Sequence, residues 1–131
     1  MAKLKKYNPD GSPPTGGRYS HVARTEGKAL LFIAGQVALD SSGKVVGKGD
    51  VSAQAEQVFR NLKSALAAEG ATFDDVAKLN VYVTDMRYRE EIQKVRTKYL
   101  PKTPPASTLV GVTSLAQPDF MLEIEAIALI D

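Results

Sequence analysis

The order of apolar and polar residues predicts two strands near the start of the chain. Residues 29–34 (ALLFIA) are almost continuously apolar and end at Gly35, which is typical of a strand that is covered on both faces. Residues 20–25 alternate loosely between apolar and polar, and the Glu-Gly-Lys sequence at 26–28 is a turn signal. Together these two segments predict a β-hairpin.

Two helices are predicted in the middle of the chain. The first covers residues 50–69, where Asp50 or Ser52 can cap the first turn. The second runs from about residue 86 to residue 100, with Asp85 as its cap. Both show the i, i+3, i+4 spacing of a helix with one apolar face. These faces consist of Val58, Phe59, Leu62, Ala65 and Leu66, and of Tyr88, Ile92, Val95 and Tyr99.

Three further strands are predicted at residues 78–84, 107–113 and 120–130. The resulting order of strands and helices indicates an α+β fold, with a sheet that carries two helices on one face. We expect one domain over residues 1–131, in which residues 1–16 form a loop-rich N-terminal segment. The second face of the sheet is left uncovered by this arrangement and needs a partner surface.

Composition and charge exclude several classes of protein. The 131 residues include no cysteine, so disulfides and thiolate chemistry are excluded, and the net charge is only +2. The one basic cluster, Lys3, Lys5 and Lys6, is interpreted as a solubilising tail, and no nucleic-acid partner is expected. Because no apolar run approaches 18 residues and the N-terminus lacks the apolar stretch of a signal peptide, we expect no membrane association and a cytoplasmic location.

The strongest candidates for chemistry are Glu123 and Glu125, which lie within an otherwise apolar strand. Buried carboxylates need partners, so either they are solvated charges on an edge strand or one lines a cleft and positions or deprotonates water. The only histidine, His21, has no nucleophile-elbow motif or metal-ligand spacing around it, and we interpret it as structural or exposed.

An ordered series of segments resembles the RidA/YjgF family, also known as the endoribonuclease L-PSP family. The resemblance spans residues 14–131 and rests on residues 17–20 (GRYS), 34–36 (AGQ), 70–78 (GATFDDVAK), 81–85 (VYVTD), 104–106 (PPA) and 123–128 (EIEAIA), with Gln54, Phe59, Asn61 and Leu62 in the first helix. It implies a chorismate-mutase-like fold with a mixed sheet, and homotrimers that enclose a barrel of packed sheets. It also implies ligand clefts between subunits, and hydrolysis of enamines and imines to 2-keto acids and ammonia without a metal or organic cofactor.

The resemblance also assigns roles to individual residues. Glu123 matches the glutamate that holds the attacking water, Tyr19 matches a tyrosine of the early loop, and Gly35 matches the glycine at a strand end. Several positions depart from the family pattern. Ser107 stands where the deaminases carry the arginine that binds the substrate carboxylate, Ala34 where a serine is usual, Gln93 where an asparagine is usual, and Leu109 where many members have cysteine.

The loss of an arginine at position 107 is the departure with the largest consequence, because a hydroxyl cannot replace the two charge-assisted hydrogen bonds of a guanidinium. Arg18 either supplies the missing charge or is an ordinary loop arginine. Alternatively, the cleft accepts a less acidic ligand, with Ser107 and Thr108 as hydrogen-bond donors.

Three functions remain open. The first is hydrolysis of an imine, enamine or related C–N bond, with Glu123 and Tyr19 as the catalytic residues. Its ligand would be held by a second set of residues: Ser107, Thr108, Gly35, Ala34, Gln93 and Arg18. The second is a non-catalytic, metabolite-binding or regulatory trimer of the same fold. The third, RNA cleavage or inhibition of translation, has the least support in the sequence.

Overall fold

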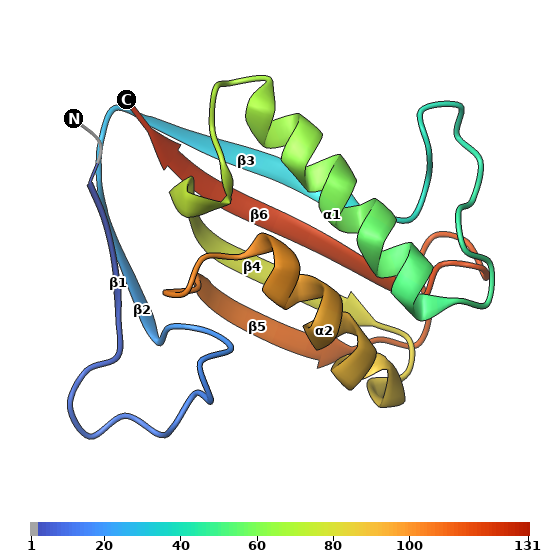
Figure 1. Ribbon diagram of the computed structural model, residues 1–131, viewed down its shortest axis with the longest axis horizontal. Coiled ribbons are helices and arrows are strands. Elements are labelled where there is room, and N and C mark those ends of the chain that lie inside the picture. The colour runs from blue at the N-terminus through green and yellow to red at the C-terminus, as the bar shows by residue number, and fades with distance from the viewer. Residues whose placement is uncertain (1–2) are drawn as a thin grey trace.

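The computed structural model describes residues 3–131, which form one four-stranded sheet, a separate two-stranded ribbon and two helices (Figure 1). The strands of the sheet lie in the order β3-β6-β4-β5, and both helices cover the same face. The elements are β1 (Lys3–Tyr7), β2 (Val22–Glu26), β3 (Ala29–Gln36), α1 (Val51–Ala67), the 3₁₀ turn η1 (Phe73–Asp75), β4 (Val76–Val83), the 3₁₀ turn η2 (Met86–Tyr88), α2 (Arg89–Tyr99), β5 (Ala106–Gly111) and β6 (Leu122–Ile130). The predicted α+β class with two helices on one face is confirmed.

Both predicted helices form, and each begins at a predicted cap. The Asp50 carboxylate accepts a hydrogen bond from the Ala53 amide at 3.1 Å and thereby satisfies one of the free N–H groups of α1. Asp85 accepts from the Arg87 amide at 2.9 Å, but the first turn after it is the 3₁₀ turn η2. The second helix therefore starts as a 3₁₀ turn and continues as α2.

The hydrophobic core lies between the helices and the sheet. Alternation along β4 and β6 directs one set of side chains beneath α1 and α2, as the pattern predicts. Phe59 of α1 stacks on Tyr99 of α2 with the ring centroids 5.2 Å apart, and Phe73 packs against both rings. The largest fully buried side chains are Phe59, Leu62, Leu66, Leu79, Ile92, Leu122 and Ile124. Within residues 3–131, no helix is long and apolar enough to cross a lipid bilayer.

The predicted β-hairpin between residues 20–25 and 29–34 is wrong. β2 pairs with β1, from Tyr7 opposite Val22 to Lys3 opposite Glu26, whereas β3 pairs with the C-terminal strand β6. The lysine-rich segment interpreted as a tail is thus a strand of the ribbon (Figure 1). Local patterns identify strands but not their partners, and β6 offers β3 a long antiparallel partner within the main sheet.

The second face of the sheet is open in the single chain and carries both apolar and acidic side chains. Phe32 of β3 is 74% exposed, and Leu30 and Val110 are also exposed on this face. The register places Tyr82 of β4 opposite Glu123 and Asn80 opposite Glu125. An exposed apolar patch of this kind is typical of a protein–protein interface.

Gln54 connects α1 to two loops and supports the start of β6. It is fully buried, donates to the carbonyl oxygens of Gly47 and Asp119, and accepts from the Met121 amide at 2.9 Å. We expect Gln54→Met to lower the free energy of unfolding by about 2 kcal/mol, because three part-buried backbone groups lose their partner. Urea denaturation measures this change.

The matched control is Lys63→Met, which introduces the same side chain at an exposed position of α1. Its free energy of unfolding is expected to stay within about 0.5 kcal/mol of the wild type. An equal decrease in the free energy of unfolding of the two variants would contradict a stabilising role for the three hydrogen bonds of Gln54.

Candidate functional site

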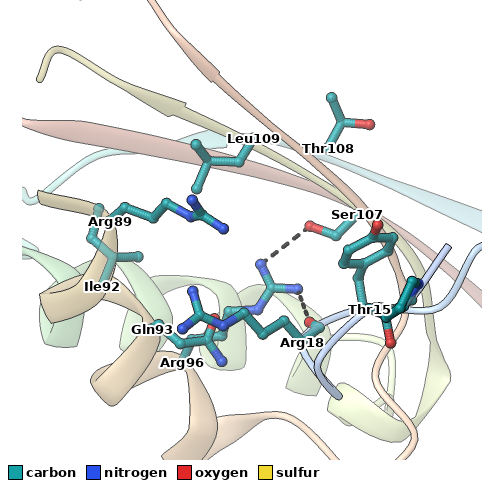
Figure 2. A pocket seen from close by; sticks show the side chains of 11 residues that line it. Thr15, Arg18, Arg89, Ile92, Gln93, Arg96, Ser107, Thr108 and Leu109 are labelled. Carbon is teal, nitrogen blue, oxygen red and sulfur yellow. Dashed lines mark hydrogen bonds between the residues drawn. The ribbon is translucent and has the colours of Figure 1, made fainter. Parts of the chain in front are cut away.

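A cavity of 420 Å³ opens between α2, the loop of residues 14–19 and β5 (Figure 2). Helical spacing brings Arg89, Gln93 and Arg96 to one face of α2, because residues four and seven positions apart share a side of a helix. Alternation along β5 directs Ser107 and Leu109 toward the same space. The cavity wall therefore combines one helix face, one strand and one loop.

The loop of residues 14–19 is held in place from both of its ends. The Ser20 hydroxyl donates to the Pro104 carbonyl oxygen at 2.6 Å, and the Ser20 amide donates to the Pro105 carbonyl oxygen at 3.0 Å. The Nε2 atom of His21 lies 2.8 Å from the Pro13 carbonyl oxygen, and the His21 ring packs edge-on against Tyr19. These contacts place Tyr19 on the cavity wall and give His21 a structural role.

Arg96 is the most unusual group at the cavity, because its guanidinium is buried without a carboxylate. The residue is only 6% exposed, and it makes no ion pair with any described acidic residue. Its Nη1 donates to Ser107 Oγ at 3.1 Å and its Nη2 to the Arg18 carbonyl oxygen at 2.7 Å, while Nε has no partner. Desolvation, and secondly the nearby positive charge of Arg18, lower the pKa of Arg96 to about 10, so it remains protonated at neutral pH.

Arg18 also lies at the cavity, but a carboxylate already compensates its charge. Its two Nη atoms donate to the Glu90 carboxylate at 3.1 and 3.0 Å. These hydrogen bonds raise the pKa of Arg18 and lower the pKa of Glu90. Arg18 therefore links the loop to the start of α2, whereas the guanidinium that reaches Ser107 belongs to Arg96.

Ser107 and Thr108 both border the cavity, but their hydroxyl groups point to opposite faces of β5. Consecutive residues of a strand point to opposite faces, and Thr108 Oγ1 accepts a hydrogen bond from Lys78 Nζ at 2.8 Å. Figure 2 shows the Thr108 side chain directed away from Ser107, whose hydroxyl meets Arg96.

A second group of predicted site residues lies on the open face of the sheet. A side chain at Gly35 would collide with Glu123, since a Cβ atom there would lie 2.7 Å from the carboxylate carbon. The glycine thus leaves room for the Glu123 carboxylate beside β3. Ala34 precedes Gly35 in this strand. The backbone of Glu123 takes part in the pairing of β6 with β4. Its carboxylate accepts no hydrogen bond from any side chain or backbone amide of residues 3–131.

Glu125, two residues further along β6, accepts two hydrogen bonds within the sheet through its Oε1 atom. It accepts from Asn80 Nδ2 at 3.0 Å and from the Tyr82 hydroxyl at 2.7 Å. The hydrogen bond from Tyr82 to Glu125 is the main reason that the pKa of Tyr82 is raised. The two carboxylates thus differ: Glu125 is bound by neighbouring donors, and Glu123 is available to a ligand or to water.

The structure divides the predicted site residues into two groups. Five of them border the cavity: Arg18, Tyr19, Gln93, Ser107 and Thr108. The other three, Ala34, Gly35 and Glu123, belong to the region of β3 and β6 around Glu123. Sequence reasoning missed Arg89 and Arg96, although both fall on the face of the second helix that contains Ile92. Among the residues described, no group of three or more His, Asp or Glu side chains is arranged to hold a metal ion.

Comparison with known proteins agrees with the fold. Residues 10–130 match the family model described as Endoribonuclease L-PSP. The protein DfrA of Myxococcus xanthus is 35% identical over 124 residues, which cover 95% of this chain and 94% of DfrA. The chain belongs to the Rid/YjgF (endoribonuclease L-PSP) family.

Solved structures of the Rid family have the same fold. YyfB of Yersinia pestis, a Rid family protein of unknown function, matches with a TM-score of 0.90 and 35% identity, covering 97% of this chain and 98% of YyfB. TdcF of Escherichia coli, solved with bound serine, matches with a TM-score of 0.71 and 30% identity, covering 78% of this chain and 81% of TdcF. The predicted family and fold are both confirmed.

The hydrogen bond between Tyr82 and Glu125 can be tested by titrating the Tyr82 hydroxyl. We expect Glu125→Gln to lower the pKa of Tyr82 toward the value of a free phenol, because the hydroxyl then donates to a neutral instead of a charged acceptor and the negative charge that opposes ionisation is removed. Spectrophotometric titration of phenolate formation measures the change, and Tyr82→Phe identifies the transition among the five tyrosines. Glu69→Gln, an exposed control, should leave it unchanged. A Tyr82 transition that stays in place in Glu125→Gln would contradict the assignment.

Proposed function

We propose that this Rid family protein is a small-molecule enzyme that hydrolyses a carboxylate-bearing imine or enamine to a 2-oxo acid and ammonia. The observation that carries the proposal is the position of Arg96, whose guanidinium lies against Ser107. The Rid deaminases that this chain resembles carry their carboxylate-binding arginine at the position of Ser107. In this chain α2 supplies a guanidinium to the same part of the cavity from the opposite wall.

Arg96 is well placed to bind a carboxylate. Its hydrogen bonds to Ser107 and to the Arg18 carbonyl hold the planar guanidinium in one orientation, and its charge has no partner within the described chain. A carboxylate in the cavity gains a charge-assisted hydrogen bond and compensates the buried cation. The serine bound by TdcF is a small molecule with such a carboxylate.

Glu123 is the proposed base. Its carboxylate has no competing side-chain donor, and the gap at Gly35 keeps the surrounding space open. Water attacks the carbon of the protonated imine and gives one proton to Glu123, so that the nitrogen becomes a neutral amine. Glu123 then returns this proton to the nitrogen, and the C–N bond breaks as the new hydroxyl group gives its proton to Glu123. A carbonyl group is left, and the ammonia takes the proton from Glu123 and leaves as ammonium. Tyr19 closes the cavity from the loop.

The proposed site needs a second copy of the chain. Ser107 faces α2, whereas Glu123 lies on the open face of the same sheet, so one chain does not bring Glu123 to its own Arg96. We propose a homotrimer in which the exposed apolar side chains Leu30 and Phe32 contribute to the contact between subunits. Each cavity then receives Glu123 from a neighbouring subunit.

A non-catalytic metabolite-binding trimer is the second candidate. The observation in its favour is that both Nη atoms of Arg96 already bond to groups of the protein itself. Such a guanidinium still attracts an anion but offers it fewer free donors. RNA cleavage has no comparable support, because no histidine borders the cavity and the His21 ring is engaged with Pro13.

Kinetics of two variants separate catalysis from binding. Ammonia release is measured from freshly generated 2-aminoacrylate or related imines. We expect Glu123→Gln to reduce kcat by about 100-fold or more, as for the loss of a general base. Arg96→Gln should reduce kcat/KM by about 10-fold to 100-fold, the effect of one hydrogen bond to a charged group.

Glu69→Gln and Arg60→Gln remove the same charges at exposed positions of the same fold and should leave the rates unchanged. Wild-type rates in Glu123→Gln would rule out its catalytic role. Saturable binding of 2-oxo acids without turnover by the wild type would favour the non-catalytic candidate.

Subunit mixing tests whether the site is shared. Glu123→Gln and Arg96→Gln trimers are combined in equal amounts, dissociated and reassembled. If each cavity uses Arg96 from one subunit and Glu123 from the next, about a quarter of the cavities in randomly mixed trimers contain both native residues. Activity should therefore recover to about that fraction. Mixed trimers that remain as inactive as their parents would show that the two residues do not act across an interface.

A further inference from the structure

The cavity contains more positive charge than a single carboxylate can compensate. Arg18, Arg89 and Arg96 all border it, and none of the other residues that line it is acidic. Glu90 neutralises Arg18 through two hydrogen bonds. Arg96 and Arg89, in contrast, form no ion pair with any carboxylate of residues 3–131. Two guanidinium charges are therefore left for a ligand.

The two arginines without an ion pair come from different turns of α2. Arg89 and Arg96 are seven residues apart on α2, which corresponds to two turns of helix and about 10 Å along its axis. Figure 2 shows both side chains directed into the cavity, with Arg96 reaching toward Ser107 and Arg89 on the side of Leu109. Two anionic groups, one for each guanidinium, would compensate both charges, and a short ligand with an anionic group at each end supplies them.

Glu123 of a neighbouring subunit is a poor partner for Arg89. An ion pair with a guanidinium stabilises the charged form of a carboxylate and weakens it as a base. The proton transfer assigned to Glu123 needs the opposite, a carboxylate that readily takes a proton from water. Arg89 is therefore not assigned to Glu123 in the proposed trimer.

We infer that the ligand is a dicarboxylate: its 2-oxo or 2-imino carboxylate lies at Arg96, and a second, terminal carboxylate lies at Arg89. The inference rests on the proposed function, which makes this cavity the substrate site. A cavity of 420 Å³ has room for a chain of four or five carbons. Arg89 is then the residue that determines specificity, and Gln93, between the two arginines on the helix face, lies beside the middle of the ligand.

Binding of a matched pair of ligands tests the inference. 2-Oxoglutarate and 2-oxopentanoate have the same carbon chain and differ only in a terminal carboxylate or methyl group. Calorimetric titration of the wild-type protein should show that 2-oxoglutarate binds about 10-fold or more tightly, the effect of one additional charge-assisted hydrogen bond. The 5-methyl ester of 2-oxoglutarate, which lacks the second charge, should bind like 2-oxopentanoate.

Arg89→Gln should abolish this preference while leaving the affinity for 2-oxopentanoate within about 3-fold of the wild type. Arg87→Gln is the matched control, because it removes the same charge two residues away, where the guanidinium is paired with Asp85 outside the cavity. Arg87→Gln should keep the wild-type preference for 2-oxoglutarate over 2-oxopentanoate. Circular dichroism and thermal melting establish that both variants are folded.

Three results would overturn the inference: equal affinities of the wild type for the two oxo acids, an unchanged preference in Arg89→Gln, or no saturable binding of either ligand. Ammonia release separates these failures from a failure of the proposed function. Equal hydrolysis of mono- and dicarboxylic imines would retain the enzyme and reject the dicarboxylate site. A preference lost in Arg89→Gln, without turnover of any imine, would retain the site and reject the enzyme.

Discussion

The buried guanidinium of Arg96 is the interaction on which the cavity depends. It joins the three parts of the wall, since its own helix, Ser107 of β5 and the backbone of the loop at Arg18 all meet at one planar group. A buried cation without a counter-ion costs free energy. The hydrogen bonds offset part of that cost, and in the proposed function the remaining charge attracts an anionic ligand. The same residue would then both shape the cavity and select what enters it.

The sheet imposes the second constraint, because it has two faces and the proposed chemistry needs both. Ser107 is directed toward the helices, and Glu123 lies on the open face, where Gly35 leaves space for its carboxylate. An isolated chain consequently contains the two parts of the proposed site, the cavity at Arg96 and the region around Glu123, at separate places. Assembly through the open face would complete the site and would also cover the exposed Phe32. Stability and catalysis would then share one interface.

Much of the fold could be predicted from local patterns, as α1 and β6 illustrate. The apolar stripe of α1 and the alternation of β6 depend on residues close together in the chain, and both are present as predicted. The partner of β3 could not be predicted, because strand pairing joins residues almost a hundred positions apart. The same limit applies to the site: Ser107 is conspicuous in the sequence, but Arg96, its hydrogen-bond partner, resembles an ordinary helix arginine.

The sequence by itself determined the family and the α+β class and places a serine at position 107, since these depend on residue identity and short-range spacing. Only the tertiary structure decided that the cavity nevertheless contains a buried cation. The side of a helix that an arginine occupies can be predicted from spacing, but whether water or protein surrounds its guanidinium depends on which elements pack beside it. Here β5 and the loop of residues 14–19 exclude water from Arg96, and a charge that would be ordinary on a surface becomes the main feature of the site.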